Sequence, residues 1–286
     1  MPDQPRAFSI RIFLPGGTAD GLKVVEKSNW SGRCVVCPRP LLPESKAREE
    51  FQRTGVYILY GPAGEDELPT VYVGQGAPVR PRLESHFAKK DFWTHVAFFV
   101  SKDENLNKAH IQHLESRLID LAKEAKRCTL DNGNTPAPTP LSEMDTADAE
   151  GFLDEVLLCL PLLGLHYFTK PAQRERTDLL HCSGPDADAY GYESSDGFVV
   201  TAGGRARGEE VDSISRGFSA LRSNLVELGV LTQAANGYQF AQDYTFSSPS
   251  TAAAVVLGRN ANGRTEWKDD QGRTLKELQE NSATVL

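Results

Sequence analysis

Residues 55–76 read GVYILYGPAGEDELPTVYVGQG and decide the fold of the region around them. Two short runs of β-branched and aromatic residues flank a polar stretch of Gly, Pro, Asp and Glu, which predicts a β-hairpin with a long loop. Because side chains alternate along a strand, Val56 and Ile58 should face one side of the hairpin and Tyr57 the other. Tyr57 and Tyr72 share a face if the register aligns them. The alternative is that these are ordinary strand tyrosines beside ordinary strand-end glycines.

A short helix is expected directly after the hairpin, in PVRPRLESHFAKK, beginning near Pro81. Helical spacing puts Arg82 and His86 one turn apart on one face. Arginine offers a planar fork of donors to phosphate oxygens, and histidine can hold or pass a proton near neutral pH. Two phenols followed by this pair form a set suited to phosphate chemistry. The alternative is a solvated arginine and a solvated histidine.

A buried strand is expected at residues 93–100, followed by a long amphipathic helix that ends near Cys128. Glu115 lies beside the apolar stripe of that helix. A carboxylate at the edge of a buried face is paired or functional, because burying it alone is costly. One carboxylate is enough to hold Mg²⁺, which keeps most of its waters. His110 and His113 lack a third soft ligand, so surface positions are expected for them rather than a zinc site.

The order of these residues resembles the GIY-YIG nucleases. Gly55-Val56-Tyr57 looks like the GIY element of that family, and Tyr72-Val73-Gly74 looks like its YIG element. The family's arginine matches Arg82, its metal-binding glutamate matches Glu115, and its late asparagine matches Asn132. The resemblance implies an α+β fold: a small α/β sandwich around a short central antiparallel sheet of three strands.

The same resemblance implies a metal-dependent endonuclease that hydrolyses phosphodiester bonds in DNA. Glu115 would hold Mg²⁺ or Mn²⁺, and Arg82 would stabilise the charge that spreads over the phosphate oxygens. The departures from the family pattern are a valine for each isoleucine and an acidic hairpin loop, residues 65–67, expected to point away from nucleic acid. Restriction of foreign DNA, or defence against it, is the biological role that the resemblance suggests.

The resemblance leaves the general base open. Tyr57 is the first candidate to accept a proton from the attacking water, with His86 as a relay. An ordinary tyrosine, with a pKa near 10, is a poor base at neutral pH, so the metal and the arginine would have to favour the phenolate. Either tyrosine or the histidine remains eligible. Tyr72 and Asn132 would position the phosphate and order the cleft.

The net charge of −8 is unusual for a nucleic-acid enzyme, whose affinity normally comes from basic side chains. The acidic excess is concentrated in residues 131–200, whereas the nuclease segment is nearly neutral. Lys89 and Lys90 are candidate nucleic-acid contacts at the rim of the cleft. Weak non-specific binding is expected, with another region or a protein partner supplying the target.

Residues 197–286 are expected to form a C-terminal α+β module. It should contain an amphipathic helix, a hairpin with Asn236-Gly237 as its turn, a helix that starts at Ser248-Pro249 and ends at Gly258, and then a strand that carries Trp267. The stretch resembles the uncharacterised domain that often follows GIY-YIG nucleases, and is similar to the restriction-and-methylase-associated (RAMA) module. That similarity implies a role in choosing or gripping DNA, against the alternative that the polar residues only make turns. The candidate contacts are Arg259, Asn260, Asn262, Arg264 and Lys268.

The remaining segments complete the expected organisation. Residues 1–50 form a β-rich leader, 51–168 hold the nuclease domain with an accessory helix, and 169–196 read as a linker rich in Pro, Gly, Ser and Asp. Cys34 and Cys37 of the leader should lie on opposite faces of a strand.

Cellular location and association are also addressed by the sequence. Five cysteines without a regular framework predict a reducing cytoplasm, and neither a signal peptide nor a bilayer-spanning segment is expected. Cutting both strands would need a homodimer or two successive events. Two other interpretations compete: a binding protein on the nuclease scaffold without useful catalysis, and an interaction protein that uses its acidic segment.

Overall fold

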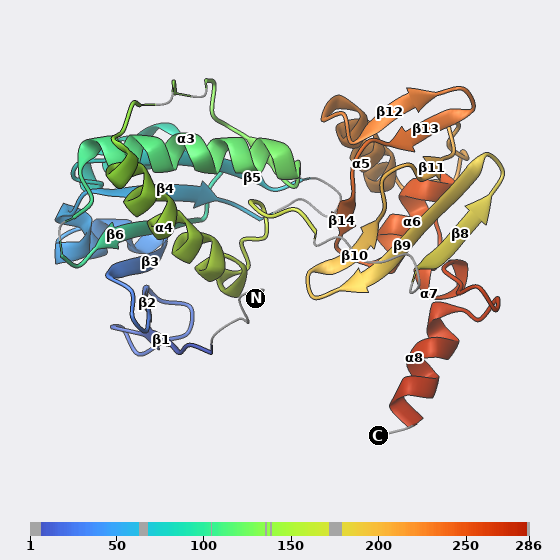
Figure 1. Ribbon diagram of the computed structural model, residues 1–286, viewed down its shortest axis with the longest axis horizontal. Helices are drawn as coiled ribbons and strands as arrows, with labels where there is room; N and C mark the ends of the chain where they lie inside the picture. Colours follow the sequence, from blue (N-terminus) through green and yellow to red (C-terminus); the bar gives the residue numbers. More distant parts are fainter. Residues whose placement is uncertain are drawn as a thin grey trace. The chain divides into compact units, whose positions relative to one another are not determined.

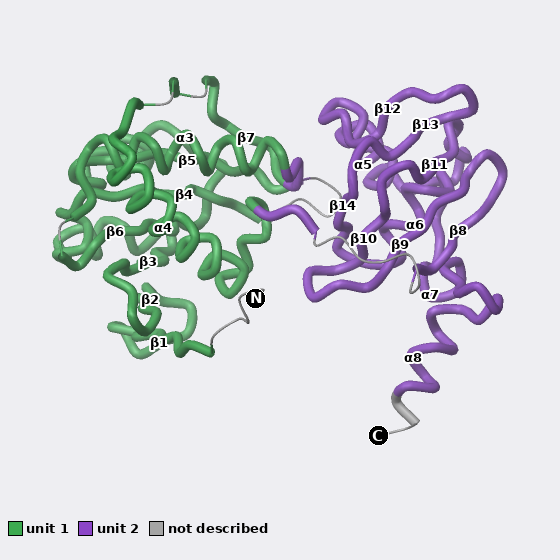
Figure 2. The backbone as a smooth tube through the Cα atoms, viewed as in Figure 1, with its two compact units in different colours: residues 1–62, 69–124, 128–168 green, residues 63–68, 125–127, 169–286 purple. Residues whose placement is uncertain are grey.

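A computed structural model describes most of the chain: residues 7–62, 68–103, 105–134, 136–137, 139–171 and 179–284. The acidic loop expected at residues 65–67 lies outside these ranges. The chain divides into unit 1, residues 1–62, 69–124 and 128–168, and unit 2, residues 63–68, 125–127 and 169–286 (Figure 2). Each unit combines helices with its own sheet, so the expected α+β class is confirmed. In the described ranges, no helix is long and apolar enough to cross a membrane.

The sheet of unit 1 is larger than the expected three strands. Its order is β1-β2-β3-β6-β4-β5-β7, and only the β5–β7 pair is parallel. The β-rich leader supplies three of these strands and lengthens the sheet: β3 pairs with β6, β2 pairs with β3, and β1 pairs with β2. The strands are β1 (Ile10–Phe13), β2 (Lys23–Lys27), β3 (Gly32–Pro38), β4 (Gly55–Tyr60), β5 (Thr70–Gly76), β6 (His95–Ser101) and β7 (Thr129–Leu130).

The hairpin register places both tyrosines on one face, as expected. Tyr57 of β4 pairs with Gly74 of β5, and Tyr72 pairs with Leu59, so the two phenols are diagonal neighbours. Val56 packs in one core and Tyr57 in the other, which confirms the predicted alternation.

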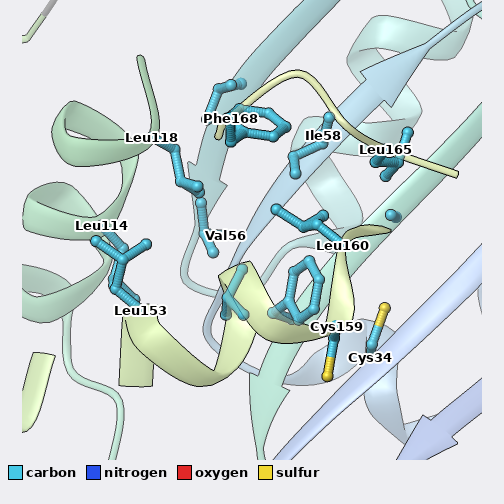
Figure 3. Packing of buried hydrophobic residues seen from close by; sticks show 14 of the residues in the cluster. Cys34, Val56, Ile58, Leu114, Leu118, Leu153, Cys159, Leu160, Leu165 and Phe168 are labelled. Carbon is cyan, nitrogen blue, oxygen red and sulfur yellow. The ribbon is translucent and has the colours of Figure 1, made fainter. Parts of the chain in front are cut away.

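Helices cover both faces of this sheet. On one face lie α3 (Lys108–Ala125) and α4 (Glu143–Cys159) (Figure 1). Figure 3 shows part of their core, with Leu114 and Leu118 of α3 and Leu153 of α4 turned toward the strands. The other face packs against α1 (Leu42–Ser45) and α2 (Arg80–Lys89). Three 3₁₀ turns, at Arg39–Leu41, Glu49–Gln52 and Pro161–Leu163, connect these elements.

Cys34 and Cys37 of β3 lie in the two different cores of unit 1, so the prediction of opposite faces is confirmed. All five cysteines are buried and reduced. The two thiols of the Cys-x-x-Cys stretch therefore act as separate small apolar side chains in the cores.

The histidines of α3 are not surface residues, and that expectation is wrong. His110 is 7 % exposed and its Nε2 lies 3.2 Å from Oδ1 of Asp145 on α4. His113 Nε2 lies 2.5 Å from Oε1 of Glu150, which also accepts from Arg117 Nε at 2.8 Å. These polar pairs fix α4 on α3. A single-helix pattern could not reveal them, because the partners come from a distant helix.

Unit 2 has a second sheet, of order β12-β13-β11-β9-β10-β14, with β8 paired to β9. Its central helix α6 (Pro249–Leu257) is buried from Ala252 to Leu257, as its uniformly apolar sequence requires. The other elements are β8 (Leu180–Gly184), β9 (Ala187–Ser194), β10 (Gly197–Val200), β11 (Arg205–Ala206), α5 (Arg216–Glu227), β12 (Leu231–Ala234), β13 (Gly237–Phe240), β14 (Tyr244–Phe246), α7 (Gly263–Glu266) and α8 (Leu275–Thr284).

Three expectations for unit 2 need correction. Residues 180–194, assigned to a linker, form β8 and β9, whose polar side chains lie on an exposed face or in the turn between them. The hairpin turn lies one residue earlier than expected, because Ala234 pairs directly with Gly237. Trp267 follows α7 and is not on a strand; the neighbouring Lys268 makes only isolated bridges. The predicted bounds of α6, from a Ser248 cap to Gly258, are confirmed.

Candidate functional site

Tyr57 is fully buried, and its phenol lies directly on the backbone of Gly74. A Cβ atom at position 74 would come within 2.5 Å of both Cζ and Oη of Tyr57. Gly74, inside β5, therefore makes room for the tyrosine of β4, and not for a ligand. The Tyr57 hydroxyl lies 2.8 Å from Nε2 of His86, within hydrogen-bonding distance.

Tyr72 is the more accessible phenol of the pair and is half-buried. Its ring centroid lies 6.3 Å from that of Tyr57, nearly parallel at 27°, and 4.8 Å from that of His86. Lys90 Nζ lies 4.7 Å from the Tyr72 ring centroid and also forms an ion pair with Asp131. An ammonium group thus already lies over the half-buried phenol of Tyr72.

Helix α2 brings Arg82 and His86 to the two phenols. Its first turn contains Pro81, which suits a helix start, and Leu83 anchors the helix in the core. Arg82 is exposed, whereas His86 is 8 % exposed. The phenols of Tyr57 and then of Tyr72 raise the pKa of Arg82, so its guanidinium lies near both phenols. The expected one-turn spacing therefore puts a fixed charge beside the tyrosine pair.

Burial keeps the Tyr57–His86 pair neutral near pH 7. It raises the pKa of Tyr57, with Tyr72 acting in the same direction and Arg82 against it. Burial, together with the charges of Arg82 and Lys90, lowers the pKa of His86 to about 4. A buried phenol beside an uncharged imidazole holds its proton more tightly than free tyrosine does. The protonation of this pair thus differs from that required of a phenolate base.

Glu115 lies on α3 and is 9 % exposed. Burial raises its pKa to about 7, and Arg82 opposes that rise. In the described part of the chain, the Glu115 carboxylate has no hydrogen bond and no ion pair with a protein group. A buried carboxylate without a protein partner suits a hard divalent cation that brings its own waters. The described residues contain no cluster of three or more His, Cys, Asp or Glu side chains that could hold a metal ion. A single carboxylate therefore fits Mg²⁺ and not zinc.

Asn132 continues the ladder between β5 and β7 beyond the end of β7. Its Oδ1 accepts from the Val73 amide at 3.0 Å, and its Nδ2 donates to the Val73 carbonyl at 2.7 Å. The side-chain amide thereby satisfies the backbone of the Tyr-Val-Gly stretch where no strand is paired. This arrangement suits the expected ordering role, and it leaves the amide groups committed to backbone.

The basic residues expected at the rim lie at the end of α2. Lys89 is exposed, and Lys90 lies over Tyr72 with Asp131 as its ion-pair partner. Asp131 was missed from the sequence, although it directly precedes Asn132. A charged residue adjoining a proposed site residue is the signal that could have identified it.

The candidate contacts of unit 2 are engaged in local structure. Arg259 Nη2 donates to Glu266 at 2.8 Å, and Arg264 Nε donates to Gln279 at 2.9 Å. Asn262 caps α7 by accepting from the Arg264 amide, and Asn260 bonds the backbone at residues 213 and 215. Lys268 is exposed and has no ion pair within the residues described. The alternative that these polar residues only stabilise turns and local structure thus accounts for most of their side chains.

A polar group that was not predicted from the sequence lies on the exposed face of β8, β9 and β11. His181 stacks on Tyr190 with centroids 4.7 Å apart, and its Nε2 lies 2.6 Å from Asp188. Asp188 also accepts from Arg205 at 3.1 Å. His181, Asp188 and Tyr190 were hidden because β8 and β9 were both assigned to a linker.

Comparison with known proteins identifies one region of the chain. Residues 180–279 match the family described as Domain of unknown function (DUF4357). The match begins at β8, so the uncharacterised C-terminal domain starts earlier than the expected residue 197. No curated protein matches the chain. No solved structure matches it either.

Proposed function

We propose that unit 1 is a metal-dependent endonuclease of the GIY-YIG type that hydrolyses phosphodiester bonds in DNA. The observation that carries the proposal is the position of Arg82. Its exposed guanidinium interacts with the hydroxyls of Tyr57 and Tyr72 and with the charge of the buried Glu115. A charge-stabilising group, two phenols and a carboxylate without a protein partner therefore act on one another.

Arg82 is assigned to the phosphate. A guanidinium can donate two parallel hydrogen bonds to phosphate oxygens and stays charged at any working pH. Interactions with charge that develops only in the transition state raise the rate of the chemical step. Because Arg82 is exposed while Tyr72 is half-buried and the other members of the group are buried, it is the member that a phosphate can reach first.

Tyr72 is assigned as the phenol that contacts the substrate. It is half-buried, whereas Tyr57 is fully buried and its hydroxyl is within bonding distance of His86. A group that takes a proton from water must come within hydrogen-bonding reach of that water. Tyr57 is therefore assigned to holding His86 beside Tyr72, in place of the base role that the sequence favoured.

Glu115 would hold Mg²⁺ or Mn²⁺ through one carboxylate. When bound, such an ion stabilises charge on the leaving oxygen and on a non-bridging oxygen of the phosphate. Ligand carboxylates must be ionised, and burial raises the pKa of Glu115 to about 7, so proton loss and metal binding are coupled at this side chain.

Cleavage by wild type and matched variants tests the proposal. The substrates are supercoiled, linear, branched and base-modified DNA, with RNA for comparison, in Mg²⁺ or Mn²⁺. We expect Arg82→Ala to lower the cleavage rate roughly 10²–10³-fold, as for other groups that stabilise transition-state charge. Glu115→Gln should abolish the metal-dependent activity.

Arg80→Ala is the matched control. Arg80 belongs to the same helix and pairs with Glu84 one turn on, at 3.2 Å. Its loss should leave cleavage within about twofold of wild type, because surface ion pairs contribute little. Equal rates for wild type, Arg82→Ala and Glu115→Gln would overturn the assigned site.

Unit 2 is proposed to grip DNA for unit 1. Support comes from its resemblance to modules found beside restriction enzymes, and Lys268 is the candidate contact that remains exposed. Restriction of foreign DNA remains the proposed biological role. A homodimer, a protein partner or two successive events would then deliver the second cut in a duplex.

A further inference from the structure

A second hollow in unit 1 lies at one end of the sheet, where β2 begins, β3 ends and β6 begins. Its volume is about 510 Å³. Its floor is apolar, and its polar lining is mainly basic, with one carboxylate among the lining side chains. The polar lining residues are Asp20, Lys23, Arg39, Thr94 and His95.

Arg39 is held in a fixed position at this hollow. Its guanidinium lies over the rings of Phe87 and Trp93, with its Cζ 5.3 and 4.8 Å from their centroids. Its Nη2 donates to the Phe87 carbonyl at 3.0 Å, and its Nη1 donates to the Trp93 carbonyl at 3.3 Å. A guanidinium has five N–H donors, so three remain for a ligand. A side chain already ordered by rings and carbonyls loses little further entropy on binding.

Lys23 and His95 also line the hollow. His95 stacks on Tyr60 with centroids 5.6 Å apart, and its Nδ1 lies 3.0 Å from Thr94 Oγ1. Burial lowers the pKa of His95, and the Lys23 ammonium lowers it further, so the two side chains are close in space. Across the described ranges, Lys23 has no ion pair or hydrogen bond of its side chain.

The chain itself links this hollow to the candidate active site. Lys90 lies over Tyr72, and Thr94 lines the hollow only four residues further on. Four residues span at most about 14 Å between Cα atoms. DNA carries one phosphate per roughly 3.4 Å of axis on each strand, so the span from Lys90 to Thr94 corresponds to at most about four nucleotides along a strand that passes over this end of the sheet.

We propose that the hollow between Lys23, Arg39 and His95 binds a backbone phosphate of the nucleic acid, a few nucleotides from the bond held at Tyr72. Lys23 supplies the free charge, Arg39 supplies oriented donors, and the apolar floor accommodates a sugar. The inference rests on the proposed function, because it places the same strand in both sites. It adds a phosphate subsite that positions the strand and carries no chemistry.

The test measures binding of a fluorescein-labelled DNA oligonucleotide to the full chain, by anisotropy, in EDTA and at several salt concentrations. We expect Lys23→Gln to weaken affinity roughly five- to tenfold at 0.1 M salt and to lower the salt slope by about one, as for one lost phosphate contact. Lys23→Glu should weaken it further. Lys108→Gln and Lys108→Glu are the controls, because Lys108 is an exposed lysine of the same unit, begins α3 and does not line the hollow. Unfolding midpoints of all four variants check that each one folds.

Cleavage kinetics separate this inference from the proposed function. If the chain cuts DNA, Lys23→Gln should raise KM and leave kcat within about twofold. If wild type cuts DNA and the Lys23 variants match the Lys108 variants in affinity and KM, the phosphate subsite alone is overturned. Binding that depends on Lys23 in a chain that cuts nothing would uphold the subsite and overturn the nuclease. Absence of both binding and cutting would overturn the two together.

Discussion

At the scale of single residues, Tyr57 and Tyr72 carry the same phenol side chain but lie in different environments. The sequence correctly put both on one face of a hairpin, because alternation in a strand follows from backbone geometry. Which phenol is buried depends on the register, and the register puts Tyr57 over Gly74. That packing could not be derived from the motif alone, so the sequence pointed to Tyr57 as the base when burial argues for Tyr72.

Glu115 gives a prediction about pH. In the metal-free protein its pKa is about 7, above the ordinary value of 4.5. The folded state therefore keeps a proton that the unfolded state loses, and stability falls as pH rises from about 4.5 through about 7. Glu115→Gln removes that dependence. As pH rises from 5 to 8, the unfolding free energy of the variant minus that of wild type should increase by about 1–2 kcal/mol, allowing for partial solvent screening.

Chemical denaturation in EDTA at the two pH values measures this difference. Glu44→Gln, at an exposed position in α1, is the control and should shift by the same amount at both pH values. If the stability difference between Glu115→Gln and wild type is the same at pH 5 and pH 8, burial does not raise the pKa of the Glu115 carboxyl.

At the scale of elements, the spacing of apolar residues predicted those helices and strands that depend on local sequence. The hairpin, α2, α3 and α6 were expected from strand alternation, helical spacing and caps, and all four are present. The misses share a physical cause: β8 and β9 expose one polar face, so their composition resembles that of a linker. Likewise, α4 is held to α3 by His113 and Glu150, which are distant in sequence. Pairing between remote elements leaves no local periodicity.

The pairing of β4 with β5 gives an element-level prediction. A Cβ at position 74 would meet Tyr57 Cζ and Oη at 2.5 Å, in the middle of two paired strands. Gly74→Ala must therefore displace the phenol or the strands, and overpacking of this kind costs about 1–3 kcal/mol. We expect a loss of that size in unfolding free energy, together with loss of the Tyr57–His86 contact, which the His86 imidazole NMR signals would report.

Gly133→Ala is the matched control for this substitution. Gly133 is exposed, and a Cβ there would have no neighbour within 4 Å. Its effect on stability should stay within about 0.5 kcal/mol, as at most surface positions. Equal stability of the two variants would mean that the β4–β5 pairing leaves more room at Gly74 than described.

At the scale of the whole molecule, charge opposes the proposed partner. The chain carries −8 overall, and DNA is a dense polyanion, so long-range repulsion must be overcome by local basic groups such as Lys23, Lys90 and Arg82. The acidic excess in residues 131–200 includes three exposed carboxylates of α4, at Glu143, Asp148 and Asp154. None has an ion pair within the described part of the chain.

Neutralising these three residues tests whether net charge limits binding. Glu143→Gln with Asp148→Asn and Asp154→Asn changes the net charge from −8 to −5, since three negative charges are removed. If DNA is the partner, association should become faster, by roughly two- to tenfold at low salt, because long-range steering acts on the encounter rate. The gain should shrink above about 0.1 M salt, where the Debye length is about 10 Å. Stopped-flow anisotropy at 0.02 and 0.2 M salt would measure both effects. An association rate that is unchanged at low salt would mean that the DNA-binding face lies beyond the reach of the α4 charges.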